Sequence, residues 1–182
     1  MQRYLGPRTV TGVDFSQDAI DFCSRRHAVE GLSFTKGDAE KLPFNDESFD
    51  AVVNVESSHC YGSMESFLRE VRLLLRPGGH FLHADLRNRG GADLWQSQLR
   101  QSGMTVVRDL DITSHVLNAL DQDHERKTGL ISGYIPPAFH SAFADFAALR
   151  GSVIYEGFRN GKFVYRCYTL RKPQVDSFLQ VT

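Results

Sequence analysis

Two acidic residues stand where predicted strands end, and each could bind part of a nucleoside. Residues 9–14 (TVTGVD) form a β-branched run that ends in Asp14, and Ser16 then offers a helix N-cap. A carboxylate between a strand and a helix of a doubly wound fold can accept hydrogen bonds from both hydroxyls of an adenosine ribose. Taken alone, Asp14 also fits a helix cap or a turn.

The second acidic residue lies in residues 37–40 (GDAE), which follow a strand predicted over residues 32–36 (LSFTK). The Asp38 carboxylate can accept from an adenine amino group while the Ala39 amide donates to a ring nitrogen, which would hold the base at two points. A polar turn is the alternative. Turn chemistry does not require the ordered series GDA, LPF and DESFD found here, so the series favours nucleoside binding.

The elements that must position these residues alternate between strand and helix. Residues 49–55 (FDAVVNV) are a near-continuous apolar run, typical of a parallel strand buried on both faces. Apolar residues then recur at helical spacing until Arg-Pro-Gly-Gly at 76–79 stops the helix, and residues 79–84 begin another strand. A helix over 91–101 and a strand over 104–111 follow. The order β-α-β-β-α-β-α-β predicts an α/β fold with a mostly parallel sheet.

Residues 113–150 break this alternation because they contain no convincing strand. They predict two inserted helices that cover a ligand, the second beginning at Pro136-Pro137. An apolar stripe on the second helix contains Phe139, Phe143, Phe146 and Leu149. Core packing is the first explanation of this stripe, and a wall for a greasy substrate is the alternative. Residues 152–157 and 163–170, joined by Asn160-Gly161, predict a terminal hairpin.

The composition indicates one compact domain over residues 1–182, with 41% hydrophobic and 24% charged residues. The formal net charge is −1 and the basic residues do not cluster, which argues against nucleic acid as a partner. We find no signal peptide and no apolar run long enough for a membrane span, which favours the cytoplasm. Three widely spaced cysteines indicate neither a disulfide framework nor a metal site.

Three blocks of sequence, TGVDFS, GDAEKLPFNDESFDAVV and LLLRPGGHFL, together resemble the class I S-adenosylmethionine-dependent methyltransferases over residues 9–87. The resemblance implies a Rossmann-like sheet of seven strands whose last strand is antiparallel, in agreement with the predicted hairpin. It also implies S-adenosyl-L-methionine as the cofactor. The implied cofactor-binding residues are Asp14, Phe15, Asp38, Ala39 and Asn54.

Residues 54–61 (NVESSHCY) resemble more closely the mycobacterial enzymes that O-methylate phthiotriolone-type waxy lipids, and residues 155–169 do so as well. This resemblance implies a hydroxyl of a lipid, polyketide or other small molecule as the methyl acceptor. Methyl transfer needs sulfur, methyl and nucleophile in line, and an alcohol must also lose its proton. We predict that His59 accepts that proton and that Glu56 and Tyr61 contact the substrate. A structural role is the alternative for all three.

Members of this family begin with a strand, a glycine-rich turn of the form E/D-x-G-x-G-x-G and a helix, and no such turn precedes residue 9. The missing strand is central in the family sheet. We therefore expect two neighbouring strands to lack a partner and to expose backbone groups and apolar side chains. We also expect the chain as given to bind the cofactor weakly.

Other functions remain open at this point. An inactive or regulatory methyltransferase-like fragment would pair with a complete methyltransferase or with a second copy of the chain. A sterol-type C-methyltransferase would share the same cofactor blocks. A nicotinamide oxidoreductase would suit Asp14 alone, but the GDA and RPGG blocks and the predicted hairpin argue against it.

Overall fold

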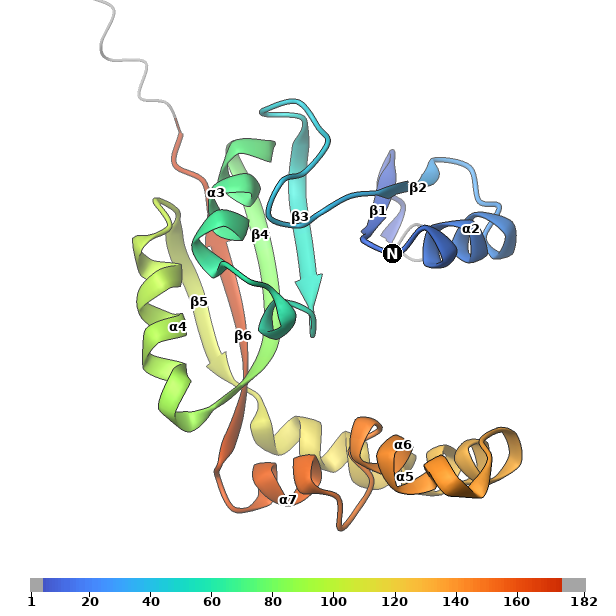
Figure 1. Cartoon of the computed structure of the whole chain (residues 1–182). Helices are drawn as coiled ribbons and strands as arrows, with labels where there is room; N and C mark the ends of the chain where they lie inside the picture. The colour runs from blue at the N-terminus through green and yellow to red at the C-terminus, as the bar shows by residue number, and fades with distance from the viewer. Residues whose placement is uncertain (1–4, 175–182) are drawn as a thin grey trace, which may run out of the picture.

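The computed structural model describes residues 5–174, which alternate between strands and helices as predicted (Figure 1). In chain order the elements are β1 (Val10–Asp14), α2 (Gln17–Arg26), β2 (Leu32–Lys36), β3 (Phe49–Val55), the 3-10 helix η1 (Ser58–Cys60), α3 (Met64–Leu74), β4 (Leu75–Asn88), α4 (Arg89–Gln101), β5 (Thr105–Asp111), α5 (Thr113–Tyr134), the 3-10 helix η2 (Pro137–Phe139), α6 (His140–Phe146), α7 (Val153–Arg159) and β6 (Phe163–Arg171). Within this described part, every helix is too short or too polar to span a bilayer.

Four strands form one sheet in the order β3-β4-β6-β5. β3 and β4 run parallel, while β6 lies antiparallel between β4 and β5. The register places Val53 beside Leu82 and Ala84 beside Cys167. This arrangement confirms a Rossmann-like α/β sheet that is mostly parallel and has an antiparallel C-terminal strand.

The hydrophobic core lies between this sheet and the helices α3 and α4. α3 begins where Ser63 Oγ accepts a hydrogen bond from the backbone N–H of Ser66 at 3.1 Å. The core contains Phe67, Leu68, Val71, Leu75, Phe81, Trp95, Leu99, Met104, Tyr168 and Leu170. On alternate positions of the strands, however, Val53 and Leu82 are 40% and 41% exposed. The prediction that residues 49–55 are buried on both faces is therefore wrong, because helices cover only one side of β3.

β1 and β2 form a separate parallel pair with α2 beside it, apart from the four-stranded sheet (Figure 1). As predicted, Ser16 caps α2, its Oγ accepting from the backbone N–H of Ala19 at 3.3 Å. Among the described strands, β1 pairs only with β2 and β3 only with β4, so each has one open edge. Val13 in β1 is 38% exposed. The open edges agree with the expectation that two neighbouring strands lack a partner.

Between β5 and β6 the chain forms a helical arm of α5, η2, α6 and α7, which contains the two helices predicted in residues 113–150. The predicted hairpin is wrong because its first strand is α7. Ser152 Oγ accepts from the backbone N–H of Tyr155 at 3.2 Å and so caps that helix. Asn160 is the C-cap, and Gly161 follows with a φ of +74°. The Asn-Gly pair therefore ends a helix instead of joining two strands.

Candidate active site

The carboxyl ends of β3 and β4 bring together a histidine and a buried carboxylate. His59 lies in η1, just after β3, and Asp85 lies in β4. Nδ1 of His59 and Oδ1 of Asp85 are 2.8 Å apart. The Asp85 side chain is fully buried, whereas 32% of the His59 side chain is exposed. One edge of the imidazole is therefore held from inside the protein while the ring remains accessible.

Asp85 is surrounded by donors that keep it ionised. Ser58 Oγ donates to its Oδ2 at 2.6 Å, and the backbone N–H of His59 donates to the same oxygen at 3.1 Å. Arg87 Nη1 lies 3.2 Å from that oxygen. Burial alone would raise the pKa of Asp85, but the hydrogen bonds from Ser58 and His59 outweigh it, and the pKa is lowered. Against an ionised carboxylate, neutral His59 carries its proton on Nδ1 and leaves Nε2 as an acceptor.

A second polar pair lies at the end of β3. The hydroxyl of Tyr165, in β6, donates to a carboxylate oxygen of Glu56 at 3.2 Å. Burial and the neighbouring Glu56 charge raise the pKa of Tyr165, so the phenol stays protonated as the donor. Glu56 has a φ of +52°, a left-handed conformation that costs a non-glycine residue about 1–3 kcal/mol. Strained backbone of this kind is concentrated at functional sites.

Asn54, Ser57 and Tyr61 form a third hydrogen-bonded group. Nδ2 of Asn54 donates to Ser57 Oγ at 2.8 Å and to the Tyr61 hydroxyl at 2.9 Å. Oδ1 of Asn54 is buried and has no hydrogen-bond partner among the described residues. Because a buried acceptor without a partner is unfavourable, this oxygen is suited to receive a hydrogen bond from a bound molecule.

The predicted nucleoside-binding acids lie at the ends of the neighbouring strands β1 and β2. The Asp14 carbonyl accepts from the N–H of Gly37 at 3.0 Å, which holds the two strand ends together. One oxygen of Asp14 accepts from the N–H of Ser16, and one oxygen of Asp38 accepts from the N–H of Glu40. Both acids therefore have a local turn role, and over residues 5–174 the second oxygen of each carboxylate has no hydrogen-bond partner.

The loop after β2 is attached to the loop after η1. The backbone N–H of Gly62 donates to Oε1 of Glu40 at 2.7 Å. The side chain of Ala39 packs against the core of the four-stranded sheet, whereas Phe15 is 73% exposed. The two halves of the candidate site are thus connected by local contacts and not by strand pairing.

The structure sorts the predicted residues into two groups. At the end of β3 and in the turn that follows lie Asn54, Glu56, His59 and Tyr61, and at the ends of β1 and β2 lie Asp14, Phe15, Asp38 and Ala39. Sequence reasoning missed Asp85 and Tyr165. Asp85 had a signal, since it is an acid placed directly after residues 79–84, where a strand was predicted. Tyr165 had none, because its contact with Glu56 depends on β6 lying beside β4.

His83 lies close to this site but belongs to the core. Its ring is 1% exposed and stacks on Phe81 with ring centroids 5.1 Å apart. Burial is the main cause that lowers the pKa of His83 to about 4. Because His83 is a weak base and its side chain is buried away from any bound substrate, it does not serve as the proton acceptor, which leaves that role to the accessible His59.

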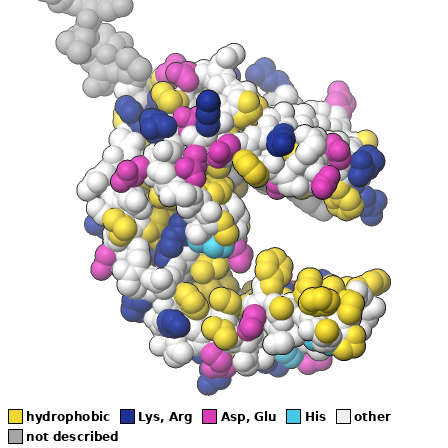
Figure 2. All heavy atoms as spheres, in the orientation of Figure 1, with side chains coloured by type: hydrophobic (Ala, Val, Ile, Leu, Met, Phe, Trp, Pro, Cys, Tyr) yellow, Lys and Arg dark blue, Asp and Glu magenta, His cyan; other side chains and the backbone are white. Residues whose placement is uncertain are grey.

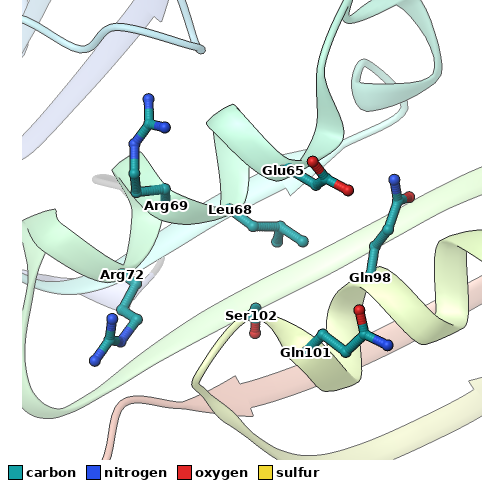
Figure 3. A pocket seen from close by; sticks show the side chains of 7 residues that line it. All are labelled: Glu65, Leu68, Arg69, Arg72, Gln98, Gln101 and Ser102. Carbon is teal, nitrogen blue, oxygen red and sulfur yellow. The ribbon is translucent and has the colours of Figure 1, made fainter.

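A separate polar pocket of about 310 Å³ lies between α3 and α4 (Figure 3). Its lining residues are Glu65, Leu68, Arg69, Arg72, Gln98, Gln101 and Ser102. None of them comes from the strand ends that carry His59 and Asp85, so this pocket is not part of the candidate site.

Several known proteins that resemble this chain in sequence or in fold are named as methyltransferases. Residues 1–83 match the methyltransferase domain family. The phthiotriol/phenolphthiotriol dimycocerosates methyltransferase of Mycobacterium tuberculosis is 37% identical over 94% of this chain, and the fatty-acid O-methyltransferase of Mycolicibacterium smegmatis is 36% identical over 95%. The chain spans 64% and 62% of the length of these two relatives. The structure of Haemonchus contortus phosphoethanolamine N-methyltransferase 2 with S-adenosyl-L-methionine has a TM-score of 0.72 at 15% identity, covering 91% of this chain and 44% of its own.

Proposed function

We propose that the chain is part of an S-adenosylmethionine-dependent methyltransferase that transfers the methyl group to a hydroxyl of a lipid or another small molecule. The observation that carries this proposal is the pair of His59 and Asp85, an oriented and accessible proton acceptor beside a strand end. The relatives named for phthiotriol dimycocerosates and for fatty acids support a lipid as the acceptor.

The described residues fit the cofactor. When bound, S-adenosylmethionine supplies an electrophilic methyl group on a positively charged sulfur. The second carboxylate oxygens of Asp14 and Asp38 can accept from ribose hydroxyls and from an adenine amino group. The buried Oδ1 of Asn54 can accept from a further donor, such as an ammonium group.

The polar groups at the end of β3 account for activation of the acceptor. Nε2 of His59 would take the proton of the acceptor hydroxyl, and the bound cofactor would supply the methyl group while its sulfur keeps the electron pair of the carbon–sulfur bond. The Asp85 carboxylate stabilises the imidazolium that forms. The Tyr165 hydroxyl holds Glu56, whose other oxygen is placed to accept from a second donor on the substrate. Tyr61 borders the same loop.

Replacement of His59 tests the proposal. We expect His59→Gln to lower the rate of methyl transfer from methyl-labelled S-adenosylmethionine to a long-chain alcohol by about a hundredfold or more, because the proton acceptor is lost. Product analysis by mass spectrometry and NMR should find a methyl ether. His80→Gln is the matched control, since His80 is an exposed histidine of β4 outside the site. A His59→Gln rate within threefold of the unmodified chain, or a product methylated on carbon, would overturn the proposal.

Asp85→Asn tests the orientation of His59. The amide can accept from the imidazole but does not stabilise its positive charge, so we expect the rate of methyl transfer to fall about tenfold or more. A rate of methyl transfer equal to that of the unmodified chain would contradict this role of Asp85.

Calorimetry with S-adenosylmethionine separately tests the predicted cofactor-binding residues at the ends of β1 and β2. Asp14 and Asp38 stand on a strand pair that is not hydrogen-bonded to the four-stranded sheet, so we expect weak binding by the chain as given. A micromolar dissociation constant would contradict this expectation while leaving the assignment of His59 intact.

A further inference from the structure

The helical arm exposes a cluster of large apolar side chains. Exposed fractions are 45% for Leu130, 81% for Tyr134, 57% for Phe139, 41% for Phe143 and 89% for Phe146. Leu130, Phe143 and Phe146 of this cluster border a groove of about 200 Å³ between α5 and α6, whose other lining residues are Lys127, Ile131 and Ala147. An exposed apolar cluster of this kind marks a binding surface, because leaving it in water is unfavourable.

The cluster faces the hollow of the molecule. Figure 2 shows a C-shaped surface whose lower limb, formed by the arm, carries apolar side chains toward the opening. β3, whose carboxyl end leads to His59, borders the same hollow (Figure 1). The root of the arm is joined to the site, since Thr113 Oγ1 accepts from the N–H of Tyr165 at 2.9 Å and the Tyr165 hydroxyl donates to Glu56.

Apart from Lys127, the side chains that line the groove are apolar. Lys127 is the cation in its lining, and its Nζ donates to the Ala147 carbonyl at 3.0 Å. The neighbouring Arg126 is bound by both carboxylate oxygens of Asp123 at 2.6 Å. A hydrocarbon chain in this apolar lining would bury the exposed rings of Phe143 and Phe146.

We propose that this groove holds the far end of the acceptor's alkyl chain while the acceptor's hydroxyl lies at His59. The inference rests on the proposed function and adds the length of the substrate. Thr113 and Leu130 are 17 residues apart in α5, about 25 Å along a helix. The hydrocarbon layer of one bilayer leaflet is about 15 Å thick. An alkyl chain that extends from His59 to this groove is therefore longer than the alkyl chain of an ordinary membrane lipid.

Binding of spin-labelled alcohols to the intact chain tests this placement. Tetracosan-1-ol with a nitroxide near its methyl end should give an immobilised electron paramagnetic resonance spectrum, and octan-1-ol labelled in the same way should remain mobile. Phe143→Ser should weaken binding of the long probe about tenfold or more, because the probe's alkyl chain loses its contact with the aromatic ring. Phe22→Ser is the matched control, since Phe22 is 58% exposed on α2, outside the arm.

Three results would overturn the proposal. The first is an unchanged long-probe affinity in Phe143→Ser. The second is flotation of the protein with neutral phosphatidylcholine vesicles without immobilisation of the free probe. This result would make the cluster a membrane contact. The third is a dimer in sedimentation that Phe146→Ser dissociates, which would make it a contact between copies.

The probe distinguishes the groove from the methyl-transfer site. His59→Gln should abolish methyl transfer and leave probe immobilisation unchanged. Immobilisation without methyl transfer in the unmodified chain would count against the proposed function and in favour of the groove.

Discussion

The four-stranded sheet and the β1–β2 pair each contain two parallel neighbouring strands, yet the two regions differ sharply in how much they bury. On the four-stranded sheet, Phe81, Leu99 and Leu170 are completely buried beneath α3 and α4. In the β1–β2 pair and α2, the one buried hydrophobic residue among those described is Ile20, and it keeps 7% exposure. The comparison teaches that the proton-accepting half of the candidate site is held rigidly by its core, while the nucleoside-binding half depends on a few local contacts such as that of Glu40 with Gly62.

The largest expected difference between the two regions is in the rate of amide hydrogen exchange. Amides of β1 and β2 open without disturbing the main core, so we expect them to exchange about a thousandfold or more faster than those paired between β4 and β6. Mass spectrometry of peptides after exchange measures this difference. Equal protection in both regions would mean that they unfold as one unit, and the comparison would fail.

The next largest expected difference is in the free energy of unfolding that is lost when a side chain is truncated. Leu99→Ala removes a side chain with no exposure, and we expect it to lower the free energy of unfolding by about 2–5 kcal/mol. Val13→Ala, in the half-exposed strand β1, should cost less than about 1 kcal/mol. Urea unfolding followed by the fluorescence of Trp95, the single tryptophan, reports on the four-stranded region. A larger loss for Val13→Ala than for Leu99→Ala would reverse the comparison.

Acid should destabilise the four-stranded region in particular. His83 has a folded-state pKa of about 4, below its ordinary value of 6.5, so the unfolded chain binds a proton more readily. The stability contributed by neutral His83 is complete above pH 6.5 and is lost as the pH falls toward 4. We expect a loss of about 3 kcal/mol over this window, since one pKa unit corresponds to about 1.4 kcal/mol.

The lowered pKa of Asp85 acts in the same direction, because its folded-state carboxylate must take up a proton in more acidic solution. His83→Gln should flatten the dependence between pH 6.5 and 4. If the unfolding free energy of this variant still falls by the same amount, another group is responsible.

The layer of strands and helices was predictable because periodicity and caps are local. The spacing of apolar residues indicated α3, and Ser16 indicated the start of α2. The terminal hairpin failed for the opposite reason. Asn160-Gly161 satisfies the local rule for a hairpin turn and equally that for a helix end, and only the cap by Ser152 decides between them.

The candidate site was predictable where one residue type carried the chemistry by itself. His59 could be singled out as a proton acceptor from its type and place in the sequence. Its partner Asp85 lies 26 positions away and meets it only because β3 and β4 are parallel neighbours. The Glu56 to Tyr165 contact spans 109 positions, beyond any local pattern.

The place of β6 in the sheet has a consequence for synthesis of the chain. β6 comes last in sequence among the described strands but lies between β4 and β5. While the chain emerges from the ribosome, β5 has no strand to join until residues 163–171 have left the exit tunnel. A chain ending before Phe163 would lose two strands from the sheet, not one, and would be an early substrate for chaperones and proteases.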